Sequence, residues 1–192
     1  MFENMFDRRN LLALLASALA APAAPALAQE MSRRTAFTFS FAGLDGHDIR
    51  LASHAGKPIL IVNTASQCGY TPQLAGLQEL WMRYRSRGLL VVGVPSNDFG
   101  GQEPGTPSEI MKTANHQYGV SFPLAEKVVV SGENAHPFYK WAAIERPGAG
   151  PRWNFHKFII GRSGRIVGSF PAAVDPMDPD LVAAIERELP AI

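Results

Sequence analysis

The stretch ILIVNTASQCGYTP, residues 59–72, sets the interpretation of the whole chain. Its first half is an unbroken run of aliphatic side chains, typical of a strand buried on both faces. Its second half holds Cys68, the only cysteine in the sequence, in a segment predicted to start a helix. A thiol at that junction would face unpaired backbone N–H groups and the positive end of the helix dipole, and both favour a thiolate. Cys68 is therefore a candidate nucleophile, although lone cysteines are also commonly small buried hydrophobic residues.

The segments that follow predict a strand, a helix and a second strand. Apolar residues recur three to four positions apart over 74–84, which predicts an amphipathic helix that stops at Gly88. Residues 89–94 form another apolar run, and this order predicts a parallel pair of strands covered by helices. A loop rich in Pro, Asn and Gly spans 95–107, and Ser108 is expected to begin a further helix.

The two ends of the chain complete the fold prediction. Apolar residues alternate with small or polar ones over 37–41 and 49–51, which predicts an N-terminal β-hairpin. Residues 158–160 and 166–170 predict a second antiparallel pair. Helices are expected at 137–144 and 179–189. Together these elements predict an α/β, thioredoxin-like fold, with a central mixed β-sheet flanked by helices and an N-terminal β-hairpin.

Composition and cysteine content limit the possible functions. The 192 residues fit a single domain, and the net charge of +1 comes from scattered residues of both signs. Without a long run of Lys or Arg, we expect no nucleic-acid partner. In a redox Cys-x-x-Cys motif the second cysteine would stand at position 71, but this chain has Thr71 there. Dithiol chemistry within the motif is excluded, and a one-thiol redox reaction remains.

The first 28 residues predict an export signal. Arg8 and Arg9 precede an apolar run over 11–20, and the small-x-small sequence 26–28 matches a signal peptidase site. The paired arginines suggest the export route for folded proteins. We therefore expect removal of 1–28, a mature thioredoxin-like domain of residues 29–192 in the periplasm, and no stable membrane insertion afterwards.

Three separated motifs resemble those of the glutathione peroxidase family, and the resemblance covers the chain from about Phe37 to Leu189. The first motif is NTASQCGYT at 63–71, the second is PSNDFGGQEPG at 95–105 and the third is WNFHKF at 153–158. Their order along the chain is also that of the family. Three motifs in the right order are far more specific than any one of them.

The resemblance implies a catalytic set of four residues. The family surrounds its peroxidatic Cys or selenocysteine with a Gln, a Trp and an Asn, and the matching positions are Cys68, Gln102, Trp153 and Asn154. Amide and indole N–H groups are donors that do not titrate, and they could support a thiolate and a departing alkoxide. The implied activity is a thiol-dependent peroxidase. It would reduce hydrogen peroxide and organic or lipid hydroperoxides to water or alcohols through a sulfenic acid on Cys68.

The implied reductant is an external thiol, with no prosthetic group. Thioredoxin-dependent members place a resolving cysteine in the region matching 112–118, where this chain has none. Glutathione or another small thiol is then the simplest co-substrate, and Arg152 is a candidate for binding its carboxylate. The short link from Trp141 to Trp153 lacks the insertion of tetrameric members, which implies a monomer with an open site. His156 is expected on the strand surface, without a catalytic role.

Three alternative functions compete with this one: a peroxiredoxin, a copper carrier and a peroxide sensor. A peroxiredoxin needs a Pro-led motif before its cysteine, which 64–68 lacks, and a copper carrier needs at least two thiols plus a His. A peroxide sensor, in which a partner protein detects oxidised Cys68, remains open. Steady-state turnover distinguishes a sensor from an enzyme.

Overall fold

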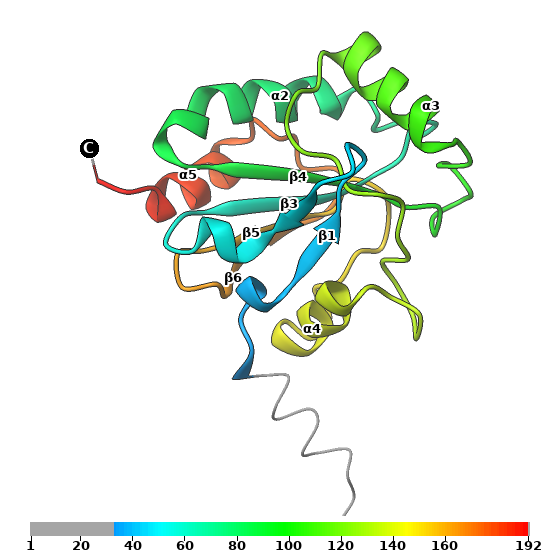
Figure 1. Ribbon diagram of the computed structural model, residues 1–192. Helices are drawn as coiled ribbons and strands as arrows, with labels where there is room; N and C mark the ends of the chain where they lie inside the picture. The colour runs from blue at the N-terminus through cyan, green and yellow to red at the C-terminus, as the bar shows by residue number, and fades with distance from the viewer. Residues whose placement is uncertain (1–32, 192) are drawn as a thin grey trace, which may run out of the picture.

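A four-stranded mixed sheet forms the centre of the molecule (Figure 1). The computed structural model describes residues 33–191, so the predicted export signal lies outside the described residues. The strand order is β4-β3-β5-β6, and β3 pairs in parallel with β4 but antiparallel with β5. The strands are β3 (Ile59–Thr64), β4 (Leu90–Pro95), β5 (Lys157–Ile160) and β6 (Ile166–Phe170). The predicted parallel pair and the predicted antiparallel hairpin of β5 with β6 are both confirmed.

The N-terminal hairpin is present but shorter than predicted. Strands β1 (Ser40–Ala42) and β2 (Asp48–Arg50) pair antiparallel as a separate two-stranded sheet. The flanking segments form 3-10 turns instead, η1 (Ala36–Thr38) and η2 (Leu51–His54). The backbone N–H of Ala36 donates to the carbonyl of Gly164 at 2.8 Å, which bonds the chain before β1 to the β5–β6 turn, and the N–H of Leu51 donates to the carbonyl of Phe39 at 3.2 Å.

Helices cover both faces of the sheet and create two hydrophobic cores (Figure 1). Helices α2 (Gln73–Tyr84) and α5 (Pro179–Glu188) pack on one face, whereas α4 (Pro137–Glu145) and β1 pack on the other. Strand β3 serves both cores because its side chains alternate, as strand geometry requires. Leu60 and Val62 belong to the α2–α5 core, and Ile59 and Ile61 belong to the α4 core. Cys68 lies in the α2–α5 core.

Helix α3 (Pro107–Lys112) begins one residue earlier than predicted. The N-cap is Thr106, whose hydroxyl accepts from the backbone N–H of Glu109, while the Glu109 carboxylate accepts from the backbone N–H of Thr106 at 2.7 Å. This reciprocal capping box satisfies two backbone donors at the helix start. A π-helical turn, η4 (Thr113–Gln117), continues the segment to about the predicted end.

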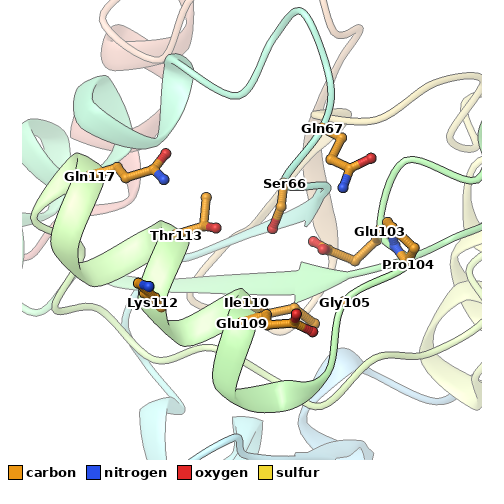
Figure 2. Close-up of a pocket in the computed structure, with 10 residues that line it drawn as sticks. All are labelled: Ser66, Gln67, Glu103, Pro104, Gly105, Glu109, Ile110, Lys112, Thr113 and Gln117. Atoms are coloured by element: carbon orange, nitrogen blue, oxygen red, sulfur yellow. The ribbon is translucent and has the colours of Figure 1, made fainter.

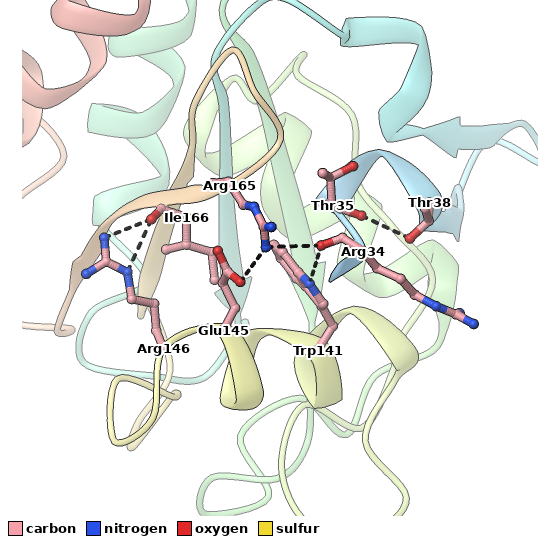
Figure 3. Close-up of polar contacts among 8 residues, drawn as sticks. All are labelled: Arg34, Thr35, Thr38, Trp141, Glu145, Arg146, Arg165 and Ile166. Carbon is pink, nitrogen blue, oxygen red and sulfur yellow. Dashed lines mark hydrogen bonds and ion pairs between the residues drawn. The ribbon is translucent and has the colours of Figure 1, made fainter. Parts of the chain in front are cut away.

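Polar contacts fasten α4 to the sheet and to the start of the described chain (Figure 3). The indole N–H of Trp141 donates to the carbonyl of Arg34 at 3.0 Å. The Glu145 carboxylate pairs with the guanidinium of Arg165 at 2.8 Å, and the Arg146 guanidinium donates to a backbone carbonyl of β6 at 2.8 Å. These contacts fix the helix that precedes the loop leading to Trp153.

Candidate active site

Cys68 lies in a closed turn that precedes α2. The prediction that its segment starts a helix is wrong, because the helix begins five residues later, at Gln73. The hydroxyl of Thr71 accepts from the backbone N–H of Cys68 at 3.0 Å and lies 2.7 Å from the Cys68 carbonyl and 2.9 Å from the Ala65 carbonyl. The backbone N–H of Thr71 also donates to the Cys68 carbonyl at 2.9 Å. Thr71, at the position of the second cysteine of a dithiol motif, thus shapes the turn that holds Cys68.

The Cys68 thiol is only 8 % exposed, and its sulfur has a backbone donor. The N–H of Tyr70 approaches Sγ at 3.5 Å. A backbone N–H that points at sulfur stabilises negative charge that develops there during a reaction, because hydrogen bonds to a charged acceptor are stronger than those to a neutral one. The stabilising donor is therefore an amide of the turn itself, and not the first turn of α2.

Gln102 and Asn154 are held together beside the Cys68 turn. The backbone N–H of Gln67 donates to the Gln102 carbonyl at 3.0 Å, which joins the loop after β4 to the turn. The side-chain amide of Asn154 donates to Oε1 of Gln102 at 2.9 Å and to the Phe99 carbonyl at 3.4 Å. Asn154 is completely buried. Its Nδ2 group donates to both Gln102 and Phe99, so Asn154 orients the Gln102 side chain.

Trp153 differs from its neighbour because 41 % of its surface is exposed. Its ring packs near that of Phe99, with ring centroids 6.1 Å apart and planes tilted by 43°. Within residues 33–191, Tyr70 is the donor that hydrogen-bonds to the Cys68 sulfur, and no such bond reaches it from Gln102, Trp153 or Asn154. The structure therefore places Gln102 and Asn154 in direct contact. Trp153 directly precedes Asn154 in the chain, and its ring packs near Phe99, whose carbonyl accepts from Asn154.

Asn63, which sequence reasoning did not select, positions the segment that carries Trp153. Its side-chain amide donates to the Trp153 carbonyl at 3.1 Å, and its own carbonyl accepts from the backbone N–H of Phe155. Phe155 adopts a φ of +64°, a left-handed conformation that is rare for a bulky residue. This backbone turn lets exposed Trp153 precede a fully buried Phe155. A polar residue at the end of a buried strand was the signal in the sequence for such a role.

His156 is buried, so its predicted place on the strand surface is wrong. Only 7 % of its surface is exposed, and Nε2 lies 3.0 Å from the hydroxyl of Ser169. Burial, assisted by the charge on Lys157, lowers the pKa of His156 to about 4. The ring is therefore neutral at physiological pH and serves as a structural hydrogen-bonding group.

Lys157 is an ammonium buried beneath α2. Its Nζ donates to Oε1 of Gln73 at 2.7 Å and to the Phe155 carbonyl at 2.8 Å. Burial lowers the pKa of Lys157 to about 8, although the carboxylate of Asp175 opposes this shift. These bonds join the segment after Asn154 to the first residue of the helix that follows Cys68, so Lys157 fixes the two halves of the site to each other.

Two hollows flank the Cys68 turn. The first, of about 560 Å³, lies between Trp153, Tyr70 and the segments near Ala149 and Ala172. The second, of about 550 Å³, lies between the turn and α3, and we call it the α3 pocket (Figure 2). The hollow next to Trp153 has a mostly apolar wall, whereas carboxylates, amides and an ammonium line the α3 pocket.

Residues 33–191 offer neither a candidate metal site nor a candidate membrane-spanning helix. They contain no group of three or more His, Cys, Asp or Glu side chains able to hold a metal ion. None of the helices in this part of the chain has the length and apolarity needed to cross a bilayer.

Comparison with known proteins establishes the family. Residues 36–143 match the family model described as glutathione peroxidase, which is more than half of the chain. The chain belongs to the glutathione peroxidase family. A hydroperoxy fatty acid reductase of Synechocystis is 44 % identical over 82 % of this chain and 98 % of its own length. A glutathione peroxidase homolog of Bacillus subtilis, BsaA, is 41 % identical over 75 % of this chain and 94 % of its own.

A solved structure supports the same assignment. The crystal structure of Trgpx in its apo form aligns with a TM-score of 0.64 and 31 % identity, over 82 % of this chain and 99 % of that chain. The predicted thioredoxin-like fold and the predicted family are both confirmed, and the chain is a peroxidase, an oxidoreductase that reduces peroxides with thiols. The family model includes Cys68 and Gln102 but ends before Trp153 and Asn154.

Proposed function

We propose that Cys68 is the nucleophile of this peroxidase and that Gln102 and Trp153 assist it, with Asn154 positioning Gln102. The observation that carries the proposal is the closed turn in which the sulfur accepts from the Tyr70 N–H while Gln102 is bonded to the same turn. A buried thiol with a fixed donor and a neighbouring fixed amide is preorganised for developing negative charge.

The oxidative half-reaction follows from this arrangement. The Cys68 thiolate attacks one peroxide oxygen, the S–O bond forms and the O–O bond breaks. The leaving oxygen departs as an alkoxide or hydroxide and takes a proton to become an alcohol or water, leaving Cys68 as a sulfenic acid. The Gln102 amide and the Trp153 indole N–H are donors suited to that leaving oxygen, because neither changes charge with pH.

The reductive half-reaction needs two external thiols. The first attacks the sulfenic sulfur, releases water and forms a mixed disulfide, and the second attacks that disulfide and releases the Cys68 thiolate. No second cysteine exists in the chain to resolve the intermediate. Glutathione or a similar small thiol is the proposed reductant, with no prosthetic group involved.

Lipid hydroperoxides are proposed as substrates alongside hydrogen peroxide. The hollow beside Trp153 has apolar walls from Pro171, Ala172 and Ala173, and it is large enough for part of an acyl chain. The similar Synechocystis protein is named for hydroperoxy fatty acids, which agrees with this substrate class. The short segment between α4 and Trp153 leaves the site open and supports a monomer.

A periplasmic location is proposed from the sequence of residues 1–28 alone. Cleavage after Ala28 would give a mature chain whose mass and N-terminal sequence are directly measurable after cell fractionation. An uncleaved chain in the cytosolic fraction would contradict this proposal.

Turnover tests the function and separates it from a peroxide sensor. Purified protein with glutathione should consume many equivalents of hydrogen peroxide and of a fatty acid hydroperoxide, and Cys68→Ser should consume none. A single equivalent consumed, with no catalytic cycle under any thiol, would favour the sensor.

A further inference from the structure

The α3 pocket lies beside the turn that holds Cys68. Its walls are the residues just before Cys68, the loop after Gln102, and the exposed side of α3 and η4. Ser66 is two residues from Cys68, so their Cα atoms are at most about 7 Å apart. A small peptide thiol attacking Cys68 could therefore place its far end in this pocket.

Glu103 is the unusual group in the α3 pocket. It is only 1 % exposed, and its Oε1 is buried without a hydrogen-bond partner in the structure. The carboxyl accepts from the side chain and the backbone of Ser66, and Figure 2 shows it pointing toward Ser66. Its backbone is also fixed, because its N–H donates to the side chain of Asn97 at 2.8 Å. An unpaired buried carboxyl oxygen is costly, since folding removed it from water without replacement.

Burial raises the pKa of Glu103, against the opposing effects of the Ser66 hydrogen bonds and the charge on Lys127. A cationic partner would lower the cost of keeping this carboxylate ionised. Glu109, the other carboxylate of the α3 pocket, is less available to bind a cation, because it already accepts hydrogen bonds from the backbone N–H and the hydroxyl of Thr106. A positively charged hydrogen-bond donor would satisfy the unpaired oxygen of Glu103 and would also offset the burial of its carboxylate.

A cation and amides complete the lining of the pocket. Lys112 lies on the wall formed by α3, and Gln67 and Gln117 add neutral donors and acceptors. Figure 2 shows Lys112, Thr113 and Gln117 across the hollow from Glu103. The buried carboxyl of Glu103 on one wall is opposite in charge to the ammonium of an α-amino acid. The exposed ammonium of Lys112 on the other wall is opposite in charge to its carboxylate.

We propose that the α3 pocket binds the amino-acid head group of the thiol that reduces Cys68, with its ammonium at Glu103 and its carboxylate at Lys112. In glutathione this head group is the γ-glutamyl end, remote from the thiol. The inference rests on the proposed function, because it concerns the reductive half-reaction of the same cysteine. It selects thiols that carry an α-amino acid over simple thiols.

Matched thiols test the two contacts separately. Protein oxidised with one equivalent of hydrogen peroxide would be mixed with glutathione, with glutaryl-cysteinylglycine, which lacks the ammonium, or with 4-aminobutanoyl-cysteinylglycine, which lacks the carboxylate. The thiol itself is the same in all three. We expect Glu103→Gln to slow reduction by glutathione about tenfold or more, as for a charged hydrogen bond, but to slow the glutaryl analogue less than about twofold.

Lys112→Gln provides an independent test that does not disturb a buried group. It should slow glutathione about two- to fivefold, as for an exposed pair, and leave the 4-aminobutanoyl analogue unaffected. Glu133→Gln, an exposed carboxylate outside the pocket, is the matched control and should change none of the rates.

The outcomes are distinguishable from failure of the proposed function. Equal slowing of all three thiols by Glu103→Gln, or no slowing at all, would overturn the ammonium contact. If that variant does not fold, equal effects of Lys112→Gln on glutathione and the 4-aminobutanoyl analogue would overturn the site. If the wild type shows no oxidation that any thiol reverses, the proposed function itself is wrong.

Discussion

Asn154→Ala tests whether Asn154 acts by holding Gln102. The substitution removes the 2.9 Å bond to Gln102 Oε1 and the weaker 3.4 Å bond to the Phe99 carbonyl. Asn154 itself is completely buried, and the two acceptors that lose its amide are partly buried. Leaving such acceptors unpaired costs about 1–3 kcal/mol, so the free energy of unfolding should fall by that amount. For a domain of this size, each kcal/mol corresponds to a Tm lower by about 2–4 °C.

The rate effect follows from the same bond. If Gln102 must be oriented when the O–O bond breaks, the variant that no longer holds it should have a higher activation free energy for Cys68 oxidation. A penalty of about 1–3 kcal/mol slows Cys68 oxidation by about 5- to 150-fold, at 1.36 kcal/mol per factor of ten. Stopped-flow oxidation by hydrogen peroxide measures the rate constant, and thermal unfolding measures the stability of the same sample.

Two comparisons make the result decisive. Asn134→Ala removes an exposed asparagine far from these contacts in the chain and should alter neither the rate nor the Tm measurably. Gln102→Ala in the Asn154→Ala background should add little to the rate loss, since the two residues act as one unit. A folded Asn154→Ala protein with a lower Tm but an oxidation rate within twofold of the wild type would refute the positioning role.

Three further substitutions give separate tests. Burial lowers the pKa of His156 to about 4 in the folded protein, whereas the unfolded chain protonates this side chain near pH 6.5. The free energy of unfolding should therefore fall as the pH drops through this window, by about 2 kcal/mol at pH 5. Urea titrations measure this change, and His156→Gln should lose the pH sensitivity. The pKa of Lys157 is about 8 in the folded protein and 10.5 in the unfolded chain. The free energy of unfolding of the wild type should therefore rise by about 1 kcal/mol from pH 7 to pH 9 relative to that of Lys157→Met. The same pH dependence in the two proteins would contradict a buried ammonium. Trp153→Phe changes an exposed side chain; its Tm should stay within about 2 °C of the wild type while Cys68 oxidation slows at least tenfold, and an unchanged rate would remove the indole N–H from the mechanism.

Local pattern was sufficient to predict the sheet and the family. The apolar runs that became β3 and β4, and the glycine that ends the following helical segment with a φ of +104°, are properties of short segments. The three motifs are likewise contiguous, so their residues could be selected before any contact was known. The family comparisons confirm the family that these motifs indicated.

Tertiary contacts decided what the sequence could not predict. Cys68 does not start the helix because the Thr71 hydroxyl closes a turn through three backbone contacts. His156 is buried because the segment near Ala149 and Ser169 covers it, which strand periodicity alone does not reveal. Glu103 lies in a loop, and its burial against Ser66 depends on a contact between two loops that are distant in the sequence. Each of these roles depends on residues distant in sequence or on the exact path of a turn.

The reactivity of Cys68 in the native fold is the central claim, and one comparison tests it most directly. The full chain would be mixed with one equivalent of hydrogen peroxide, and the sulfenic acid would be trapped with dimedone and followed by mass spectrometry, in buffer and in urea that unfolds the protein. The turn and its neighbouring amides predict much faster labelling of Cys68 in the folded protein, and loss of the sulfenic acid when glutathione is present. Equal labelling rates in the folded and unfolded chains would contradict the account, because the fold would then contribute nothing to the chemistry of this thiol.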